Sequence, residues 1–168
     1  SRYPTMKTYK GKAVNNPQLS TRLGYTPLGF HAMIQSPDGA IFIDPLATNQ
    51  TKYYTSSYAK HGTVSKEVEA MTWNCGAKIT DKAIEPSPVN PSTSRNQNVP
   101  VDLYIYRAAI ASTGEYAAYH NATTKEEILA RYVSIMNRAN MIFERDIAIR
   151  MVLIDDTDKL IFLDAETD

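Results

Sequence analysis

The fold of the second half of this 168-residue chain is decided by residues 123–143, Thr-Thr-Lys-Glu-Glu-Ile-Leu-Ala-Arg-Tyr-Val-Ser-Ile-Met-Asn-Arg-Ala-Asn-Met-Ile-Phe. Apolar side chains recur there at steps of three and four residues, which predicts an amphipathic helix of about five turns. Glu126 and Glu127 each follow a threonine by three residues, so Thr123 or Thr124 is expected to cap the helix. Arg131 and Arg138 lie off the apolar stripe and are expected in solvent. The stripe consists of Ile128, Tyr132, Ile135, Met136, Ala139 and Phe143.

Two strand patterns flank this helix. The segment 101–110 is rich in β-branched and aromatic residues and predicts a buried strand. The segment 147–154, Ile-Ala-Ile-Arg-Met-Val-Leu-Ile, predicts a second strand, followed by an acidic turn at Asp155–Asp158. Because the order is strand, helix, strand, a βαβ unit with parallel strands is expected.

The first half of the chain favours antiparallel strands. Ser36-Pro-Asp-Gly39 has the composition of a type I turn. Residues 25–34 before it, entered through a Pro-Leu-Gly turn, and residues 40–44 after it predict the two arms of a β-hairpin. Residues 7–14, and the segment that contains Tyr53, Tyr54 and Tyr58, predict further strands.

These patterns divide the chain into three regions and predict an α+β fold. Residues 1–80 are β-rich, and residues 101–168 hold the βαβ unit. Residues 81–100 combine four prolines with Ser, Asn and Thr, which indicates an exposed linker that a protease would cut.

Composition excludes several classes of function. Lys+Arg and Asp+Glu are both 18, so the net charge is zero and a general affinity for nucleic acid is not expected. No apolar run approaches the ~20 residues of a membrane span. Cys75 is the only cysteine, so no disulfide forms within the chain. Asn49 and Asn121 begin N-glycosylation sequons, and the 11 tyrosines leave a carbohydrate-binding β module as a minor alternative.

The residues alone do not assemble a complete active site. His31, His61 and His120 belong to no H-E-x-x-H motif, so zinc held by them and Cys75 is a weaker alternative to ordinary hairpin and loop positions. The acidic turn at 155–158 lacks the glycine and distal glutamate of a calcium loop, which favours a solvated turn. Glu115 and Glu144 have no identifiable acid–base partner.

Several segments, taken in order, resemble one family. The segments 9–17, 25–34 and 39–45 resemble the propeptide of secreted bacterial zinc metallopeptidases of the reprolysin (adamalysin-like) type, which are metzincins. The segment 108–116 resembles the first strand of their catalytic domain, 136–146 the first helix and its exit, and 160–168 the segment after the second strand. The resemblance implies a propeptide-like region 1–80 and an incomplete metzincin-like α/β domain from residue 101.

The resemblance also implies what this chain lacks. The family's zinc ligands come from H-E-x-x-H-x-x-G-x-x-H, which is expected downstream of Asp168. We therefore expect a fragment of a secreted endopeptidase precursor that is inactive alone, with a propeptide that assists folding and latency. No catalytic or metal-binding residue carries over. No cofactor is expected in this chain, and zinc is expected in the full-length enzyme.

Cys75, in Trp73-Asn-Cys-Gly76, has three interpretations. It is a cysteine-switch ligand to an external zinc, as in related metalloproteases, or it forms a disulfide with a cysteine outside this sequence. The third interpretation is a buried, inert thiol.

A structural role is the alternative function. A βαβ unit is too small to bury both faces of its sheet and leaves open strand edges. Partners that would cover them are the missing downstream catalytic segment or neighbouring copies of the chain, as in an extracellular, self-assembling filament subunit.

Overall fold

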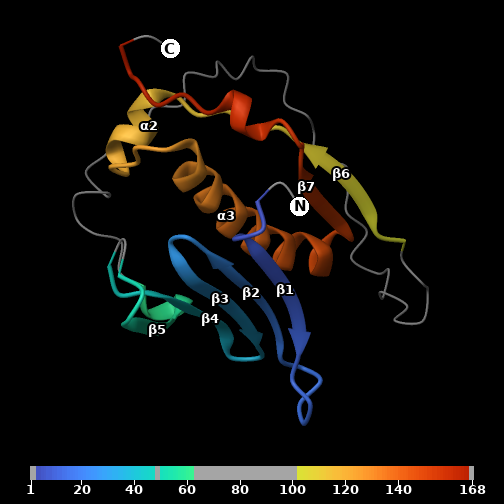
Figure 1. Ribbon diagram of the computed structural model, residues 1–168. Coiled ribbons are helices and arrows are strands. Elements are labelled where there is room, and N and C mark those ends of the chain that lie inside the picture. The colour runs from blue at the N-terminus through green and yellow to red at the C-terminus, as the bar shows by residue number, and fades with distance from the viewer. Residues whose placement is uncertain (1–2, 48–49, 63–101, 167–168) are drawn as a thin grey trace, which may run out of the picture. The chain divides into compact units, whose positions relative to one another are not determined.

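The computed structural model describes residues 3–47, 50–62 and 102–166, all of which belong to one compact unit. It confirms the α+β class: a five-stranded antiparallel sheet is followed by helices and a parallel strand pair (Figure 1). The predicted linker 81–100 and Cys75 lie outside the described residues.

The N-terminal sheet is a meander in which each strand pairs with the next. The predicted hairpin across Ser36–Gly39 is confirmed, and Gly39 has a φ of 119°, a backbone conformation that side-chain-bearing residues rarely adopt. The strands expected at 7–14 and near Tyr54 are also present. The five strands are β1 (Lys7–Lys12), β2 (Ser20–Thr26), β3 (Gly29–Ser36), β4 (Gly39–Pro45) and β5 (Tyr54–Tyr58).

The strand expected over residues 25–34, entered through a Pro-Leu-Gly turn, is confirmed in part. The turn leads into β3, but Tyr25 and Thr26 before it belong to β2. Pro27 and Leu28 form the turn between β2 and β3, and Tyr25 pairs with Phe30 across it. Gly29 makes this geometry possible because its φ is 110°.

The second half contains the expected strand–helix–strand unit. β6 (Tyr104–Ala108) pairs in parallel with β7 (Ile149–Leu153), and α3 (Lys125–Asp146) connects them. Three elements of the described chain were not predicted: most of β2, α2 (Gly114–Tyr119) and the 3-10 helix η1 (Ala59–His61). The expected acidic turn leads into a second 3-10 helix, η2 (Thr157–Leu160).

Helix α3 begins at the capping box that the sequence predicts. Thr124 is the N-cap residue, its hydroxyl accepts a hydrogen bond from the Glu127 amide, and the Glu127 carboxylate accepts one from the Thr124 amide. The helix has 22 residues, about six turns at 3.6 residues per turn, so it is a turn longer than expected.

Two burial predictions were wrong. Strand β6 was expected to be buried, yet Tyr104, Ile105 and Tyr106 are all more than half exposed. The reason is that, among the described strands, β6 pairs with β7 alone, and of these two strands α3 packs mainly against β7. Ile135, expected on the apolar stripe, is 54% exposed.

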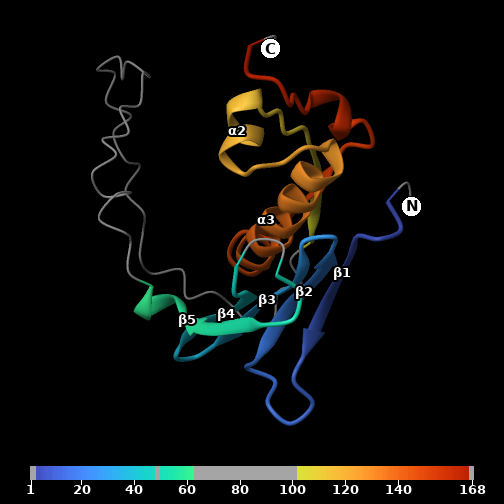
Figure 2. The ribbon, with the colours of Figure 1, turned by 60° about the vertical axis from the view of Figure 1, so that its left-hand side comes forward.

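Helix α3 contacts both sheets (Figure 2). The Asn137 side-chain amide donates to the carbonyl oxygen of Leu23 in β2 at 2.9 Å. Three residues later, Asn140 accepts from the amide of Met151 in β7 and donates to its carbonyl, both at 2.8 Å. These buried asparagines therefore fix the helix to the two sheets at adjacent positions on its surface.

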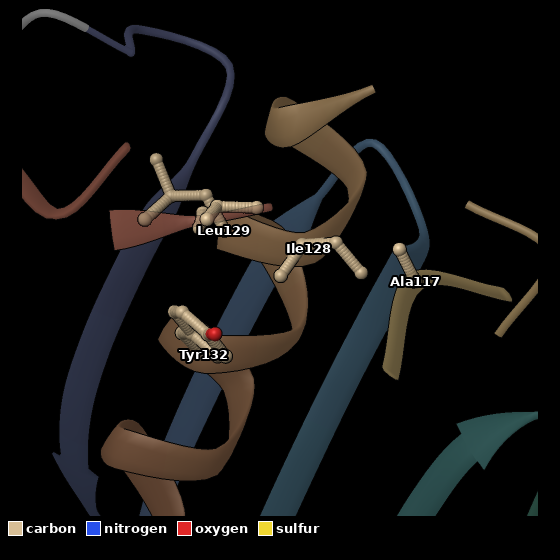
Figure 3. Packing of buried hydrophobic residues seen from close by; sticks show 5 residues of the cluster. Ala117, Ile128, Leu129 and Tyr132 are labelled. Carbon is tan, nitrogen blue, oxygen red and sulfur yellow. The ribbon is translucent and has the colours of Figure 1, made fainter. Parts of the chain in front are cut away.

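The main hydrophobic cluster lies at the N-terminal end of α3. Ile128, Leu129 and Tyr132 pack with Ala117 of α2 and with Ile161, and all are at most 5% exposed (Figure 3). Helix α2 and the segment after η2 therefore both pack against the N-terminal end of α3.

Candidate functional site

A cavity of about 230 Å³ lies among strands β3 and β4, helix α2 and helix α3. Strands β3 and β4 provide one side of its lining, and α3 provides another with residues spaced three and four apart. It is lined by Leu28, His31, Asp44, Tyr116, His120, Arg131, Ser134, Ile135 and Arg138. Two of the three histidines singled out from the sequence therefore meet here.

Asp44 connects the sheet to the helix in this cavity. Its Oδ1 atom lies 2.8 Å from His31 Nδ1 and 2.5 Å from Arg138 Nη2. Burial alone would raise the pKa of Asp44, but the hydrogen bonds from His31 and Arg138 outweigh it and lower that pKa below its usual value. Asp44 is therefore ionised at neutral pH. Arg138, expected in solvent, is instead half-buried and ion-paired.

His120 and Tyr116 form the α2 side of the cavity. Their rings meet edge to face with centroids 4.5 Å apart. Burial, together with the positive charge of Arg131, lowers the pKa of His120, and burial raises the pKa of Tyr116. At neutral pH the imidazole is therefore uncharged and the phenol keeps its proton.

This arrangement is suited to binding more than to hydrolysis. A carboxylate that orients a histidine is half of a catalytic triad. Ser134, the one aliphatic hydroxyl in the lining, donates to the carbonyl oxygen of Ala130 in its own helix at 3.1 Å. The triad is therefore not completed by the residues of this cavity.

A second cluster surrounds Glu144 near the C-terminal end of α3. Its carboxylate accepts hydrogen bonds from Lys10 of β1 at 2.8 Å, from Arg22 of β2, and from Arg150 of β7 at 2.5 Å. The side chain of Glu144 is only 6% exposed. One buried carboxylate therefore connects three cations from both sheets, although the sequence suggested no partner for it.

The electrostatics of this cluster favour the ionised carboxylate. Burial raises the pKa of Glu144, but hydrogen bonds from Arg150, Lys10 and Arg22, with charge attraction, lower it to about 2. The same pairing raises the pKa of Arg150. The cluster stabilises the packing of α3 between the two sheets, and its residues have no evident chemical role.

The remaining candidate residues do not converge on a site. His61 is exposed on η1, with its ring against Tyr58. Asn121 is exposed after α2, with a φ of 51°. Asn49 and Cys75 lie outside the described residues. In the acidic turn, Asp156 pairs with Lys159 at 3.2 Å.

The described part of the chain contains no group of three His, Cys, Asp or Glu side chains that is able to hold a metal ion. Over the same part of the chain, no helix has the length and apolar character of a membrane span.

Sequence reasoning missed Asp44, Arg138 and Glu144 as interacting groups. Asp44 is the last residue of an apolar strand pattern, and Arg138 lies between apolar positions of a helix, so each resembled a solvated residue. Only Glu144 had a nearby candidate partner in the sequence, because Arg150 follows it by six residues, beyond the predicted end of the helix.

Comparison with known families gives one match, which covers residues 103–168: reprolysin-like metallo-peptidases of family M12B. This range contains β6, α2, α3, β7 and η2. It supports a metallopeptidase-family segment in this part of the chain. Searches of curated proteins and of solved structures found no match.

Proposed function

We propose that this chain is part of the precursor of a secreted, zinc-dependent endopeptidase. Residues 101–168 are the start of its metallopeptidase domain, and residues 1–80 belong to its propeptide. The observation that carries the proposal is the reprolysin-like family match over residues 103–168. Zinc is then the cofactor of the full-length enzyme, bound by residues outside this sequence.

The packing of the N-terminal sheet supports a folding role for the propeptide. Lys10 and Arg22 of the sheet neutralise Glu144 of α3, and Asp44 pairs with Arg138. Without the sheet, Glu144 would keep only Arg150, Arg138 would lose Asp44, and the amide of Asn137 would lose the Leu23 carbonyl. A segment that supplies such contacts stabilises the helix of the domain that follows it.

Latency and processing complete the proposal. The sequence contains no H-E-x-x-H, so the chain alone is inactive. Cys75 is proposed as a ligand to the zinc of the full-length enzyme, and residues 81–100 as the processing site. Asn121, which is exposed, and Asn49 are the proposed glycosylation acceptors in an extracellular protein.

The natural gene product provides the decisive test. Its sequence should continue into H-E-x-x-H-x-x-G-x-x-H, and the 168-residue chain, supplied with zinc, should not cleave a fluorogenic peptide. A natural polypeptide that ends near Asp168 would overturn the precursor assignment. Turnover by the chain alone would overturn its inactivity.

A non-catalytic, self-assembling extracellular subunit is the second candidate, and the exposure of β6 favours it. Tyr104, Ile105 and Tyr106 are 60%, 62% and 55% exposed on a strand that, within the described residues, pairs along one edge only. Such an edge accepts a further strand. Mass spectrometry of the natural chain and its assembly state separate the two candidates: a full polypeptide of this length that self-associates supports the subunit.

A further inference from the structure

The cavity beside Asp44 has more hydrogen-bond donors than acceptors. Asp44 is the only carboxylate among the described residues that line it, and its Oδ1 atom is shared by His31 and Arg138. The Nε atoms of Arg131 and Arg138 are buried without a hydrogen-bond partner. A buried donor without an acceptor is costly, so this wall favours an additional acceptor.

Arg131 is the arginine of this lining that has no carboxylate partner in the described part of the chain. Within residues 3–47, 50–62 and 102–166, no carboxylate forms an ion pair with it. Its charge nevertheless reaches the cavity: after burial, it is the second cause of the lowered pKa of His120, and it opposes the burial that raises the pKa of Tyr116. Asp44 balances the charge of Arg138, so the positive charge of Arg131 remains without a carboxylate partner among the described residues of the lining.

Apart from Ser134, whose hydroxyl is bonded within its own helix, the rest of the lining is apolar or aromatic. Leu28 and Ile135 contribute hydrocarbon, and the Tyr116 and His120 rings form an edge-to-face pair. Ile135 is 54% exposed on a helix whose neighbouring apolar positions are buried, so its side chain is available to a ligand. The volume of about 230 Å³ is below the range of drug-sized pockets, which restricts the ligand to a small molecule.

We infer that this cavity binds a small organic carboxylate. The carboxylate pairs with Arg131, whose guanidinium is suited to bidentate contact, and the hydrocarbon part packs against Ile135 and Leu28. A monoanion matches the single uncompensated charge. Because the lining comes from both the sheet and the helices, the bound ligand also stabilises their association.

The test titrates benzoate into the full 168-residue chain by calorimetry. Benzamide, its neutral isostere, tests the need for charge, and inorganic phosphate tests whether any anion binds. Benzoate should bind and should raise the melting temperature, while benzamide and phosphate should not. Arg131→Gln should weaken benzoate binding about tenfold or more. Arg107→Gln, which removes the same charge from the exposed strand β6, should leave it unchanged.

A second variant keeps the test independent of any folding defect in Arg131→Gln. Ile135→Ala truncates a mostly exposed side chain and should weaken benzoate binding but not acetate binding. The inference is overturned if benzoate fails to bind, or if Arg131→Gln binds it as well as the wild type. Phosphate binding as tight as that of benzoate would also overturn it, because the site would then select inorganic anions.

Discussion

Replacing Glu144 with Gln removes the one negative charge that connects Lys10, Arg22 and Arg150. The amide has nearly the same shape as the carboxylate, so the change tests charge and not packing. A pKa that falls from 4.5 to about 2 on folding corresponds to about 3 kcal/mol of stabilisation at neutral pH. Because glutamine keeps part of the hydrogen bonding, we expect a loss of about 2–3 kcal/mol.

The stabilisation by Glu144 should depend on pH in a direction that follows from its lowered pKa. The folded-state pKa of Glu144 is lowered, so its stabilisation is fully present above pH 4.5 and is lost as the pH falls towards about 2. The difference between wild type and Glu144→Gln should therefore be constant near neutrality and should shrink below pH 4.5. Other carboxylates titrate in both proteins and largely cancel in the difference.

Urea denaturation of the wild-type 168-residue chain and of its Glu144→Gln variant at several pH values measures this difference. Glu166→Gln is the matched control, because Glu166 is exposed, and it should change the free energy of unfolding by less than about 0.5 kcal/mol. A loss below about 1 kcal/mol at pH 7 would refute the reasoning. So would a loss that is the same at pH 7 and at pH 2.5.

Three further substitutions test other parts of the fold. Thr124→Ala removes the α3 cap and should cost about 0.5–2 kcal/mol in urea denaturation, whereas an equal effect of Thr123→Ala would contradict the assignment of the cap. Asn140→Ala leaves the amide and carbonyl of Met151 without their side-chain partner and should cost about 2 kcal/mol; hydrogen exchange at β7 unchanged from wild type would contradict this. Gly114→Ala places a Cβ against the backbone of Asp164 and Ala165 and should cost about 1–3 kcal/mol and expose the segment after η2 to proteases. Gly11→Ala meets only a side-chain methyl at 3.1 Å and should do neither.

Local patterns predicted the elements whose formation depends on near neighbours. The capping box at Thr124 and Glu127 needs residues three apart, and the Ser36–Gly39 turn needs four consecutive residues. The parallel pairing of β6 and β7 followed from the strand–helix–strand order. In the first two cases the deciding residues are close together in the sequence. In the third, the pairing follows from a general rule of chain connection.

The candidate site was less predictable because its contacts span long sequence separations. Asp44 and Arg138 are 94 residues apart, and Arg22 and Glu144 are 122 apart. Either arginine, viewed in its own segment, has the pattern of a solvated residue. The exposure of Ile135 likewise depends on the position of the sheet over the helix, which the helical period does not specify.

The sequence by itself determined helix α3 with its cap, the β3–β4 hairpin, the parallel pair of β6 and β7, the α+β class and the absence of H-E-x-x-H from these 168 residues, because these depend on local pattern, chain connection and residue identity. Only the tertiary structure decided which charges are paired. Packing α3 between two sheets places Glu144 among three cations and Asp44 beside Arg138, and it leaves Arg131 without a carboxylate among the described residues. The physical reason is that burial removes water from these groups, so each must be satisfied by whatever distant residues the fold brings near.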